Sequence, residues 1–218
     1  MALFVCLLID VRPTYMAIVS HAGCYMSEQL ALFANAPSGP EGLQFATEFV
    51  SAATEHSLIS EIRALPLQPF QFGQFEGKRR VASFGFRYDY ELKRLQAAEP
   101  IPGWLAESVE AIETFGGPGT DIQQVLCTEY EVGVGIGWHR DKPHFDRVFG
   151  LSLGSACKFR FRRPNDRKWD RFSLNVEPRS LYMMSGLSRQ VWEHSIPGVE
   201  ALRYSITFRT LRKGSDAG

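Results

Sequence analysis

The sequence has no excess of charge of either sign. Its 218 residues carry 24 lysines and arginines against 24 aspartates and glutamates, so the formal net charge is zero. The charge of the whole chain therefore does not favour a nucleic acid or a membrane, and a polyanion would have to bind at a local patch. A chain of this length is expected to form one domain around one sizeable core.

Cysteine pairs and long apolar runs are also missing. The four cysteines, Cys6, Cys24, Cys127 and Cys157, include no Cys-x-x-Cys pair, which argues against a disulfide framework or a zinc ribbon and favours a reducing cytoplasm. The apolar run at residues 2–9 is too short to span a bilayer. It also lacks the basic start of a secretion signal. We expect a cytoplasmic protein that does not associate with membranes.

Residues 1–42 are expected to be an N-terminal extension that is either partly disordered or mis-started, with Met26 as the natural start. The residues after Met26 read like a polar leader, and the stretch 35–42 is rich in turn residues. Residues 43–212 are expected to form a single domain. Its first segment, residues 43–50, reads as a short extended piece.

Helical periodicity occurs twice between residues 51 and 116. The stretch 51–65 places Leu58 and Ile62 on one side behind a serine that can cap the helix, and a second helix is predicted at about 102–115, opened by Pro102. Between them, residues 80–90 alternate with period two and indicate a strand. Its aromatic face is predicted to carry Phe84, Phe86, Tyr88 and Tyr90.

After Thr120 no helical period remains, and eight short runs typical of strands follow. They are residues 123–130, 132–138, 147–154, 157–163, 171–177, 180–186, 190–196 and 203–210. Short strands at this close spacing predict a sandwich or barrel of the jelly-roll type, with the two helices packed outside it. The expected fold class is therefore α+β, mainly β.

His139 and Asp141 lie two positions apart at the end of one predicted strand, so their side chains project to the same side. His194, in a later strand, could supply a third ligand. Two imidazoles and one carboxylate on one face of an octahedral ion leave three positions open, as in non-haem Fe(II) oxygenases. Taken alone, His-x-Asp is also compatible with an ordinary polar turn.

The last predicted strand carries Arg203 and Arg209 six positions apart, so period two places both on one face. Two guanidinium groups facing into a barrel are costly to bury without anions. Asp141 is one available anion, and a small dicarboxylate held by Arg209 could be the other. The alternative is a surface strand with solvated arginines.

At this point the chain resembles a known family, the AlkB-like Fe(II)/2-oxoglutarate dioxygenases. The resemblance rests on "TEYEVGVGIGWHRD", "GLSLGSACKFRFRR", "SLYMMSGLSRQVWEHSIP" and "RYSITFR", and covers roughly Arg79 to Arg212. It implies a double-stranded β-helix (jelly roll) at about 120–212, flanked by two N-terminal helices. It also implies an N-terminal substrate-recognition lid at about 70–100.

The same resemblance implies the roles of individual residues. His139, Asp141 and His194 would hold Fe(II), and Arg209 would bind the distal carboxylate of the cosubstrate 2-oxoglutarate. Arg203 would bridge the metal aspartate and the cosubstrate, and Tyr130 would offer its hydroxyl. The chain departs from the family at Thr128 and Ser205, where asparagine is frequent and the shorter hydroxyls reach less far. It also has Pro143 where the repair enzymes often carry an acidic residue near the base.

The function implied by the resemblance is oxidative demethylation of alkylated DNA or RNA bases, single- or double-stranded, by a monomer that uses Fe(II), 2-oxoglutarate and O2. Basic and aromatic residues are expected to contact the substrate, because phosphates attract cations and a flipped base stacks on rings. These predicted substrate residues are Lys78, Arg79, Arg80, Phe84, Phe86, Tyr88, Trp138, Arg160 and Arg162. The basic stretch 158–171 is equally compatible with a strand edge protected by charge.

Two other readings remain open from the sequence. The same iron chemistry could act on a protein or a small molecule, which the neutral charge and Pro143 favour. Alternatively, the jelly roll could be a non-catalytic binding module with a vestigial or structural metal site.

Overall fold

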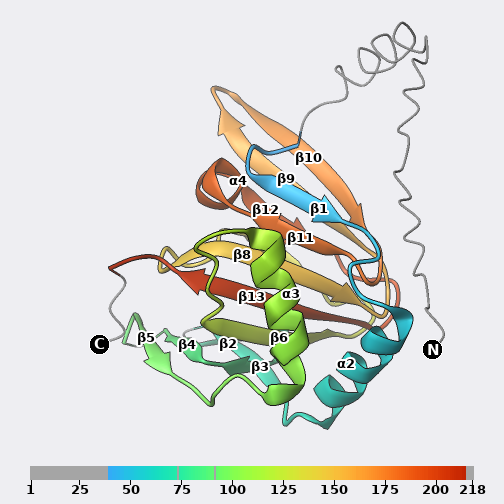
Figure 1. The fold of residues 1–218 in the computed structure, drawn as a ribbon. Helices are drawn as coiled ribbons and strands as arrows, with labels where there is room; N and C mark the ends of the chain where they lie inside the picture. The colour runs from blue at the N-terminus through green and yellow to red at the C-terminus, as the bar shows by residue number, and fades with distance from the viewer. Residues whose placement is uncertain (1–38, 73, 91, 215–218) are drawn as a thin grey trace, which may run out of the picture. The chain divides into compact units, whose positions relative to one another are not determined.

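The computed structural model describes residues 39–72, 74–90 and 92–214 (Figure 1). The residues before 39, which include most of the predicted extension, Met26, Cys6 and Cys24, lie outside this described part. From Gly39 onward the chain forms one compact unit.

The larger of the two main sheets has seven antiparallel strands in the order β1-β11-β8-β13-β6-β3-β2. Their bounds are β1 Leu43–Ala46, β2 Gln68–Phe72, β3 Phe75–Phe84, β6 Gln124–Tyr130, β8 Phe145–Leu153, β11 Leu181–Met184 and β13 Arg203–Leu211. Residues on β6 and β13 alternate between the two faces, so that Cys127 and Ile206 face the helices while Thr128 and Thr207 face the second sheet.

The second sheet has four antiparallel strands in the order β10-β9-β12-β7. Their bounds are β7 Ile136–His139, β9 Cys157–Asn165, β10 Lys168–Val176 and β12 Glu193–Ile196. From β6 to β13 the chain passes back and forth between the two sheets, which is the double-stranded β-helix that the sequence predicts. All eight predicted runs contain a strand, although the one expected at 190–196 begins with a short helix, α4 Gly186–Gln190, and β12 follows it.

Two helices cover the outer face of the seven-stranded sheet (Figure 1). Helix α2 Ala52–Ala64 begins where the Ser51 hydroxyl accepts a hydrogen bond from the Thr54 amide at 3.0 Å, as the serine cap predicts. The second helix is a 3-10 turn, η1 Gly103–Leu105, followed by α3 Ala106–Gly116. Leu58, Ile62 and Ile112 from these helices pack on the sheet in one apolar core. A second core fills the space between the two sheets.

The strand predicted at 80–90 is interrupted at Gly85, which corrects the expected single aromatic face. Gly85 has φ of 74°, and a Cβ atom there would lie 2.1 Å from the Gln123 carbonyl oxygen. The chain turns at this glycine into β4 Phe86–Asp89, which pairs with β5 Arg94–Ala97 in a separate two-stranded sheet. Phe84 therefore packs in the helix-side core, whereas Phe86 and Tyr88 pack against the core between the sheets.

Within the described residues no helix is long and apolar enough to cross a membrane.

Candidate metal centre

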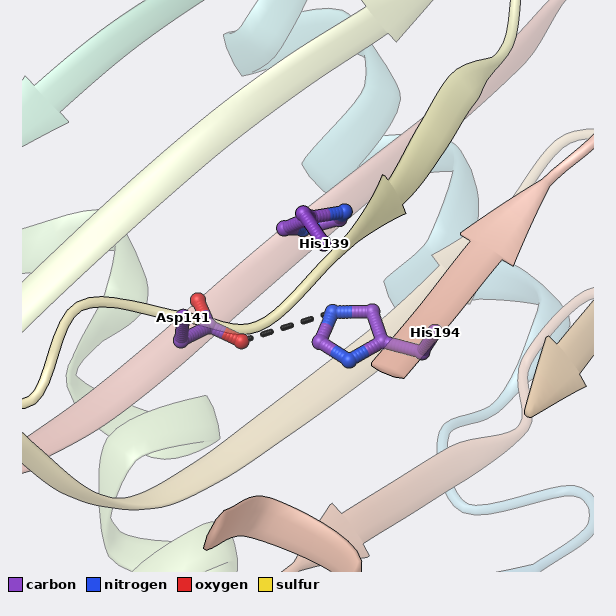
Figure 2. Close-up of side chains that lie close together, drawn as sticks. All are labelled: His139, Asp141 and His194. Carbon is purple, nitrogen blue, oxygen red and sulfur yellow. Dashed lines mark ion pairs between the residues drawn. The ribbon is translucent and has the colours of Figure 1, made fainter. Parts of the chain in front are cut away.

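Three side chains with metal-ligating atoms converge between the two sheets. His139 ends β7 and lies directly opposite His194 on β12, while Asp141 follows β7 in the next loop. One ligand atom from each lies within 4.8 Å of the other two. Figure 2 shows the carboxylate and both imidazole rings turned toward a common point. The sequence-predicted triad is therefore assembled.

A bulge in β7 explains how the strand points the required side chain inward. Ile196 pairs with Ile136 and His194 with His139, so β7 has one more residue than β12 between these pairs. The extra residue lets both Ile136 and His139 face the cavity while Trp138 lies on the opposite face.

The electrostatics of the three groups suit a divalent cation. Burial and the neighbouring His139 lower the pKa of His194 to about 3, and burial also lowers the pKa of His139. Both rings are therefore neutral at pH 7 and have a lone pair to offer. Burial alone would raise the pKa of Asp141, but Arg209 and the two histidines outweigh it and hold that pKa below its usual value. Two neutral imidazoles and one carboxylate are the donor set of a non-haem Fe(II) site.

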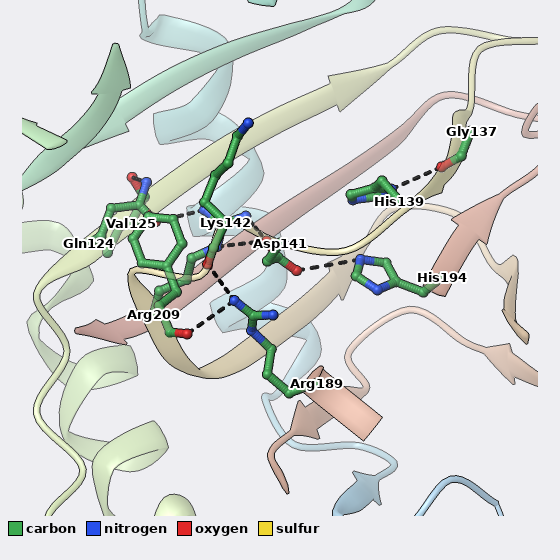
Figure 3. A network of polar contacts seen from close by, with 10 residues as sticks. Gln124, Val125, Gly137, His139, Asp141, Lys142, Arg189, His194 and Arg209 are labelled. Carbon is green, nitrogen blue, oxygen red and sulfur yellow. Dashed lines mark hydrogen bonds and ion pairs between the residues drawn. The ribbon is translucent and has the colours of Figure 1, made fainter. Parts of the chain in front are cut away.

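Contacts behind the ligands fix their orientation (Figure 3). His139 Nδ1 lies 2.9 Å from the Gly137 carbonyl oxygen, so this nitrogen donates and Nε2 is free to ligate. Arg209 donates to Asp141 Oδ1 from Nε at 3.1 Å and from Nη2 at 2.9 Å, and its Nη1 donates to Gln124 Oε1 at 2.7 Å. The structure thus corrects the expected contact of Arg203 with the metal aspartate, because Arg209 makes it.

Arg189 supports the loop that carries Asp141. Its Nη2 donates to the carbonyl oxygens of Lys142 and Phe145, on either side of the turn after the aspartate. The sequence interpretation missed Arg189 and Gln124. Neither belongs to a recognisable motif, since a buried arginine that binds carbonyl groups and a glutamine at a strand start have no spacing signature.

Arg203 lies in different surroundings from Arg209. It is only 1% exposed, its Nη2 donates to Ser152 Oγ at 3.1 Å, and its guanidinium carbon lies 5.1 Å from the centre of the Tyr130 ring. Nε and Nη1 of Arg203 are buried, and no hydrogen-bond partner for them is present among the described residues. Buried donors without acceptors are costly, so this position calls for an anion that the protein itself does not supply.

A cavity adjoins the three metal-ligating residues. Cosubstrate residues predicted from the sequence line it at Thr128, Tyr130 and Arg209, and Ser205 is buried on β13, paired with Thr128. Tyr182, which sequence reasoning missed, also lines the cavity, and burial raises the pKa of its hydroxyl.

The predicted substrate residues separate into three groups. Only Arg79 lines the cavity, while Tyr88 packs against the core between the sheets, with its ring centre 5.6 Å from that of His144. Phe84 and Phe86 are core residues, Lys78 is exposed, and Arg80 pairs with Glu129. Trp138, Arg160 and Arg162 lie together on the outer face of the four-stranded sheet, which corrects the expectation that the Trp138 ring stacks on the flipped base.

Comparison with known proteins identifies the family. Residues 43–209 match the 2OG-Fe(II) oxygenase superfamily. An "Alkylated DNA repair protein ALKBH8 homolog" of Arabidopsis thaliana is 26% identical over 201 residues, which cover 80% of this chain and 56% of that protein. The "tRNA (carboxymethyluridine(34)-5-O)-methyltransferase ALKBH8" of Mus musculus is 31% identical over 164 residues, covering 72% of this chain and 24% of that protein. The chain thus spans about half or less of the length of these relatives.

Among solved structures, that of OsALKBH1 superposes with a TM-score of 0.58 at 18% identity, covering 80% of this chain and 99% of that one. This likeness concerns the fold, and it agrees with the two-sheet arrangement described above. Together with the superfamily match and the assembled His139–Asp141–His194 triad, it shows that the chain is an AlkB-like member of the 2OG-Fe(II) oxygenase superfamily, a dioxygenase that uses Fe(II), 2-oxoglutarate and O2.

Proposed function

We propose that this dioxygenase oxidises an alkyl group on a nucleic-acid base and so demethylates alkylated DNA or RNA. The observation that carries the proposal is a second arginine, Arg79, which lines the cavity together with Arg209 and has no hydrogen-bond or ion-pair partner among the described residues. The names of the two relatives, one a DNA repair protein and one a tRNA methyltransferase, support a nucleic-acid substrate.

His139, Asp141 and His194 would hold Fe(II) on one face, leaving the cavity side for 2-oxoglutarate and O2. We propose that Arg203, and not Arg209 as the sequence suggested, binds the distal carboxylate of 2-oxoglutarate. Arg209 is already occupied by Asp141 and Gln124, whereas Arg203 has two buried donors without acceptors. The Tyr130 hydroxyl and Thr128 would complete this end of the cosubstrate site.

Arg79 would contact the substrate. It projects from β3, its guanidinium carbon lies 4.0 Å from the centre of the Phe70 ring, and among the described residues no acceptor is paired with it. Burial lowers the pKa of Arg79. An arginine nevertheless stays protonated, so the guanidinium group remains a cation that can bind an anion. A phosphate next to the target nucleotide would satisfy it.

The segment around β4 would form the lid over the reacting base. Lys142 Nζ lies 4.5 Å from the centre of the Tyr88 ring and 4.6 Å from that of Tyr90, so the lid aromatics are in contact with the loop that follows Asp141. When bound, Fe(II) and 2-oxoglutarate supply, with O2, an oxygen atom to the substrate C–H bond, and 2-oxoglutarate is converted into succinate and CO2. An N-methyl group oxidised in this way leaves as formaldehyde. The protein's part is to orient the base and to exclude water.

The test is mass spectrometry of a single-stranded oligonucleotide that carries 1-methyladenine or 3-methylcytosine, incubated with Fe(II), 2-oxoglutarate and O2. We expect loss of the methyl group by the protein and none by His139→Ala. Arg79→Gln should raise the KM for the oligonucleotide while succinate formation without substrate continues. Absence of base oxidation with every DNA and RNA substrate, while succinate is still formed, would overturn the nucleic-acid assignment and leave the dioxygenase.

The second candidate is the same chemistry on a protein or small molecule, which the zero net charge and Pro143 favour. Salt separates the two candidates, because binding of a polyanion weakens steeply as salt rises and binding of a small neutral molecule does not. The monomeric state and the cytoplasmic location expected from the sequence belong to the same proposal.

A further inference from the structure

The outer face of the four-stranded sheet, which points away from the metal centre, carries basic and aromatic side chains. On β9 and β10 the residues alternate, so that Phe159, Phe161 and Phe172 pack inward on the core between the sheets. The opposite face is open to solvent along β10, where Trp169 and Arg171 are exposed. The hairpin β9–β10 and strand β12 lie side by side in this layer (Figure 1).

Four of these residues form a stacked ladder. The guanidinium carbon of Arg162 lies 4.4 Å from the centre of the Trp138 ring and 4.4 Å from that of Trp169, while Arg160 lies 5.0 Å from Trp138. Stacking on a ring fixes the plane of a guanidinium group and leaves its N–H edge directed outward. Trp169 is still 40% exposed, so the ladder ends in a free aromatic surface.

The charges on this face do not balance. Arg171 lies directly opposite Arg162 in the β9–β10 pairing, and like charges opposite each other destabilise a sheet. Glu193 neutralises one of them, since its carboxylate accepts from Arg162 Nε at 2.7 Å. Among the described residues, the hydrogen bond that Arg160 makes is to the uncharged Ser195 hydroxyl, at 3.1 Å. Three arginines against one glutamate leave two positive charges on one face of a chain whose net charge is zero.

The excess charge lies at the metal-centre end of the sheet. At the other end, Lys158 shares a surface hollow with Glu177 and Glu200, which balance it. Trp138, by contrast, immediately precedes the ligand His139 on β7, the edge strand of the sheet. A chain bound along the ladder would therefore reach the edge of the sheet next to the cavity.

We propose that Trp138, Arg160, Arg162, Trp169 and Arg171 form a binding surface for single-stranded nucleic acid outside the catalytic cavity. Arg160 and Arg171 bind backbone phosphates, Arg162 holds the two tryptophan rings that it contacts, and a base stacks on the exposed Trp169. Such a combination of cations and an aromatic ring binds single strands with little regard to sequence. The nucleic-acid class rests on the proposed function, but the surface would bind strands with no modified base. Charges that merely protect the edge strand β10 would require neither the two tryptophans nor the stacked geometry.

The test is the fluorescence anisotropy of a labelled, unmodified single-stranded oligonucleotide titrated with the full chain. We compare the double variant Arg160→Gln/Arg171→Gln with a control that removes two exposed cations elsewhere, Arg63→Gln/Lys213→Gln. The first variant should weaken binding by about tenfold and reduce the salt slope by about 1.4, since each lost phosphate contact on a single strand accounts for about 0.7. The control should retain both the affinity and the slope.

A second variant, Trp169→Ala, tests stacking without a change of charge. It should weaken binding by about fivefold or more at an unchanged salt slope, because stacking of one base contributes on the order of 1–3 kcal/mol. Melting curves establish that each variant is folded. If the wild type, both variants and the control bind the oligonucleotide with equal affinity, the proposed binding surface is wrong. It is also wrong if polyglutamate displaces the labelled oligonucleotide as well as an unlabelled oligonucleotide does, which would indicate an acidic protein partner.

The two proposals fail in different ways. If unmodified strands bind through this surface and no modified base is ever oxidised, the binding surface stands and the proposed substrate is wrong. If modified bases are oxidised but the two ladder variants bind and react like the wild type, the catalytic proposal stands and the surface is wrong.

Discussion

Arg203 and Arg209 project from the same face of β13 but meet different groups. Arg209 contacts Asp141 and Gln124, whereas Arg203 lies against the Tyr130 ring, and its Nε and Nη1 have no hydrogen-bond partner among the described residues. We predict that Arg203→Gln weakens 2-oxoglutarate binding by about tenfold or more, since a hydrogen bond to a charged group contributes about 1.5–3 kcal/mol. The affinity of the Arg203→Gln variant for the metal should be unchanged. Anaerobic absorbance titration of the Fe(II) protein with 2-oxoglutarate measures the first quantity.

The matched variant is Arg209→Gln, which removes the cation beside the metal aspartate. It should weaken metal binding by about 10–100-fold, as loss of groups that orient ligands does elsewhere. A result in which Arg203→Gln binds 2-oxoglutarate normally and only Arg209→Gln fails to bind it would restore the assignment made from the sequence.

The buried histidine of the triad makes the metal-free protein sensitive to acid. The pKa of His194 is lowered from 6.5 to about 3 in the folded protein, so between these values the unfolded chain binds the additional proton. The free energy of unfolding should therefore fall as the pH falls through this window, by about 1.4 kcal/mol per pH unit for one such group. Urea unfolding from pH 7 to pH 4 measures it.

His194→Gln should flatten this dependence, because the variant has no imidazole to protonate at this position. The control His56→Gln changes an exposed residue on α2 and should keep the slope of the wild type. A slope that is the same in all three proteins would contradict the burial of a neutral imidazole.

At the scale of elements, Gly85 connects the seven-stranded sheet to the two-stranded sheet of β4 and β5. Its φ of 74° and the Gln123 carbonyl oxygen leave no room for a side chain, whereas Gly103, at the start of η1, has no atom within 4 Å of an added Cβ. Gly85→Ala should lower the free energy of unfolding by about 1–3 kcal/mol, and Gly103→Ala should leave it nearly unchanged. Denaturant unfolding of both variants decides this, and equal stabilities would show that the backbone at Gly85 can relax.

The elements that the sequence predicts well are those with a single period. The Ser51 cap and the spacing of Leu58 and Ile62 place each end of α2 within one residue of its observed position, and the strand expected at 157–163 lies within β9. The break at Gly85 is not predictable from alternation, because the aromatic residues continue the same period on both sides of it. The bulge in β7 is equally hidden, since it depends on the pairing with β12.

The residues of the candidate site also divide into those that the sequence pattern predicts and those that depend on strand pairing. His139, Asp141 and His194 are identified by residue type and spacing, which a metal ion constrains directly. Whether Arg203 or Arg209 contacts Asp141 depends instead on which end of β13 lies beside the aspartate. That is decided by the antiparallel register, in which Arg209 pairs with Gln124 and Arg203 with Tyr130. One-dimensional periodicity places both arginines on one face but cannot say which one meets the aspartate.

At the scale of the whole molecule, the fold has two sheets that each supply part of one site. The ligand histidines come from the four-stranded sheet and both arginines from the seven-stranded sheet. A metal ion and 2-oxoglutarate would therefore join the two layers, and any ligand that binds only the folded state stabilises it. We predict that Mn(II), used as a redox-inert substitute, raises the Tm, and that 2-oxoglutarate raises it further only when the metal is present.

Mutation should separate the rise in Tm caused by Mn(II) from the further rise caused by 2-oxoglutarate. His139→Ala should lose both rises, because the cosubstrate needs the metal as well as the protein. Arg203→Gln should keep the metal increment and lose most of the second, which at a hundredfold excess over Kd corresponds to about 2.7 kcal/mol. Differential scanning fluorimetry at fixed protein concentration measures these shifts. A 2-oxoglutarate increment of equal size with and without Mn(II) would mean that the cosubstrate binds away from the triad, and the site assembled between the sheets would then not be the catalytic one.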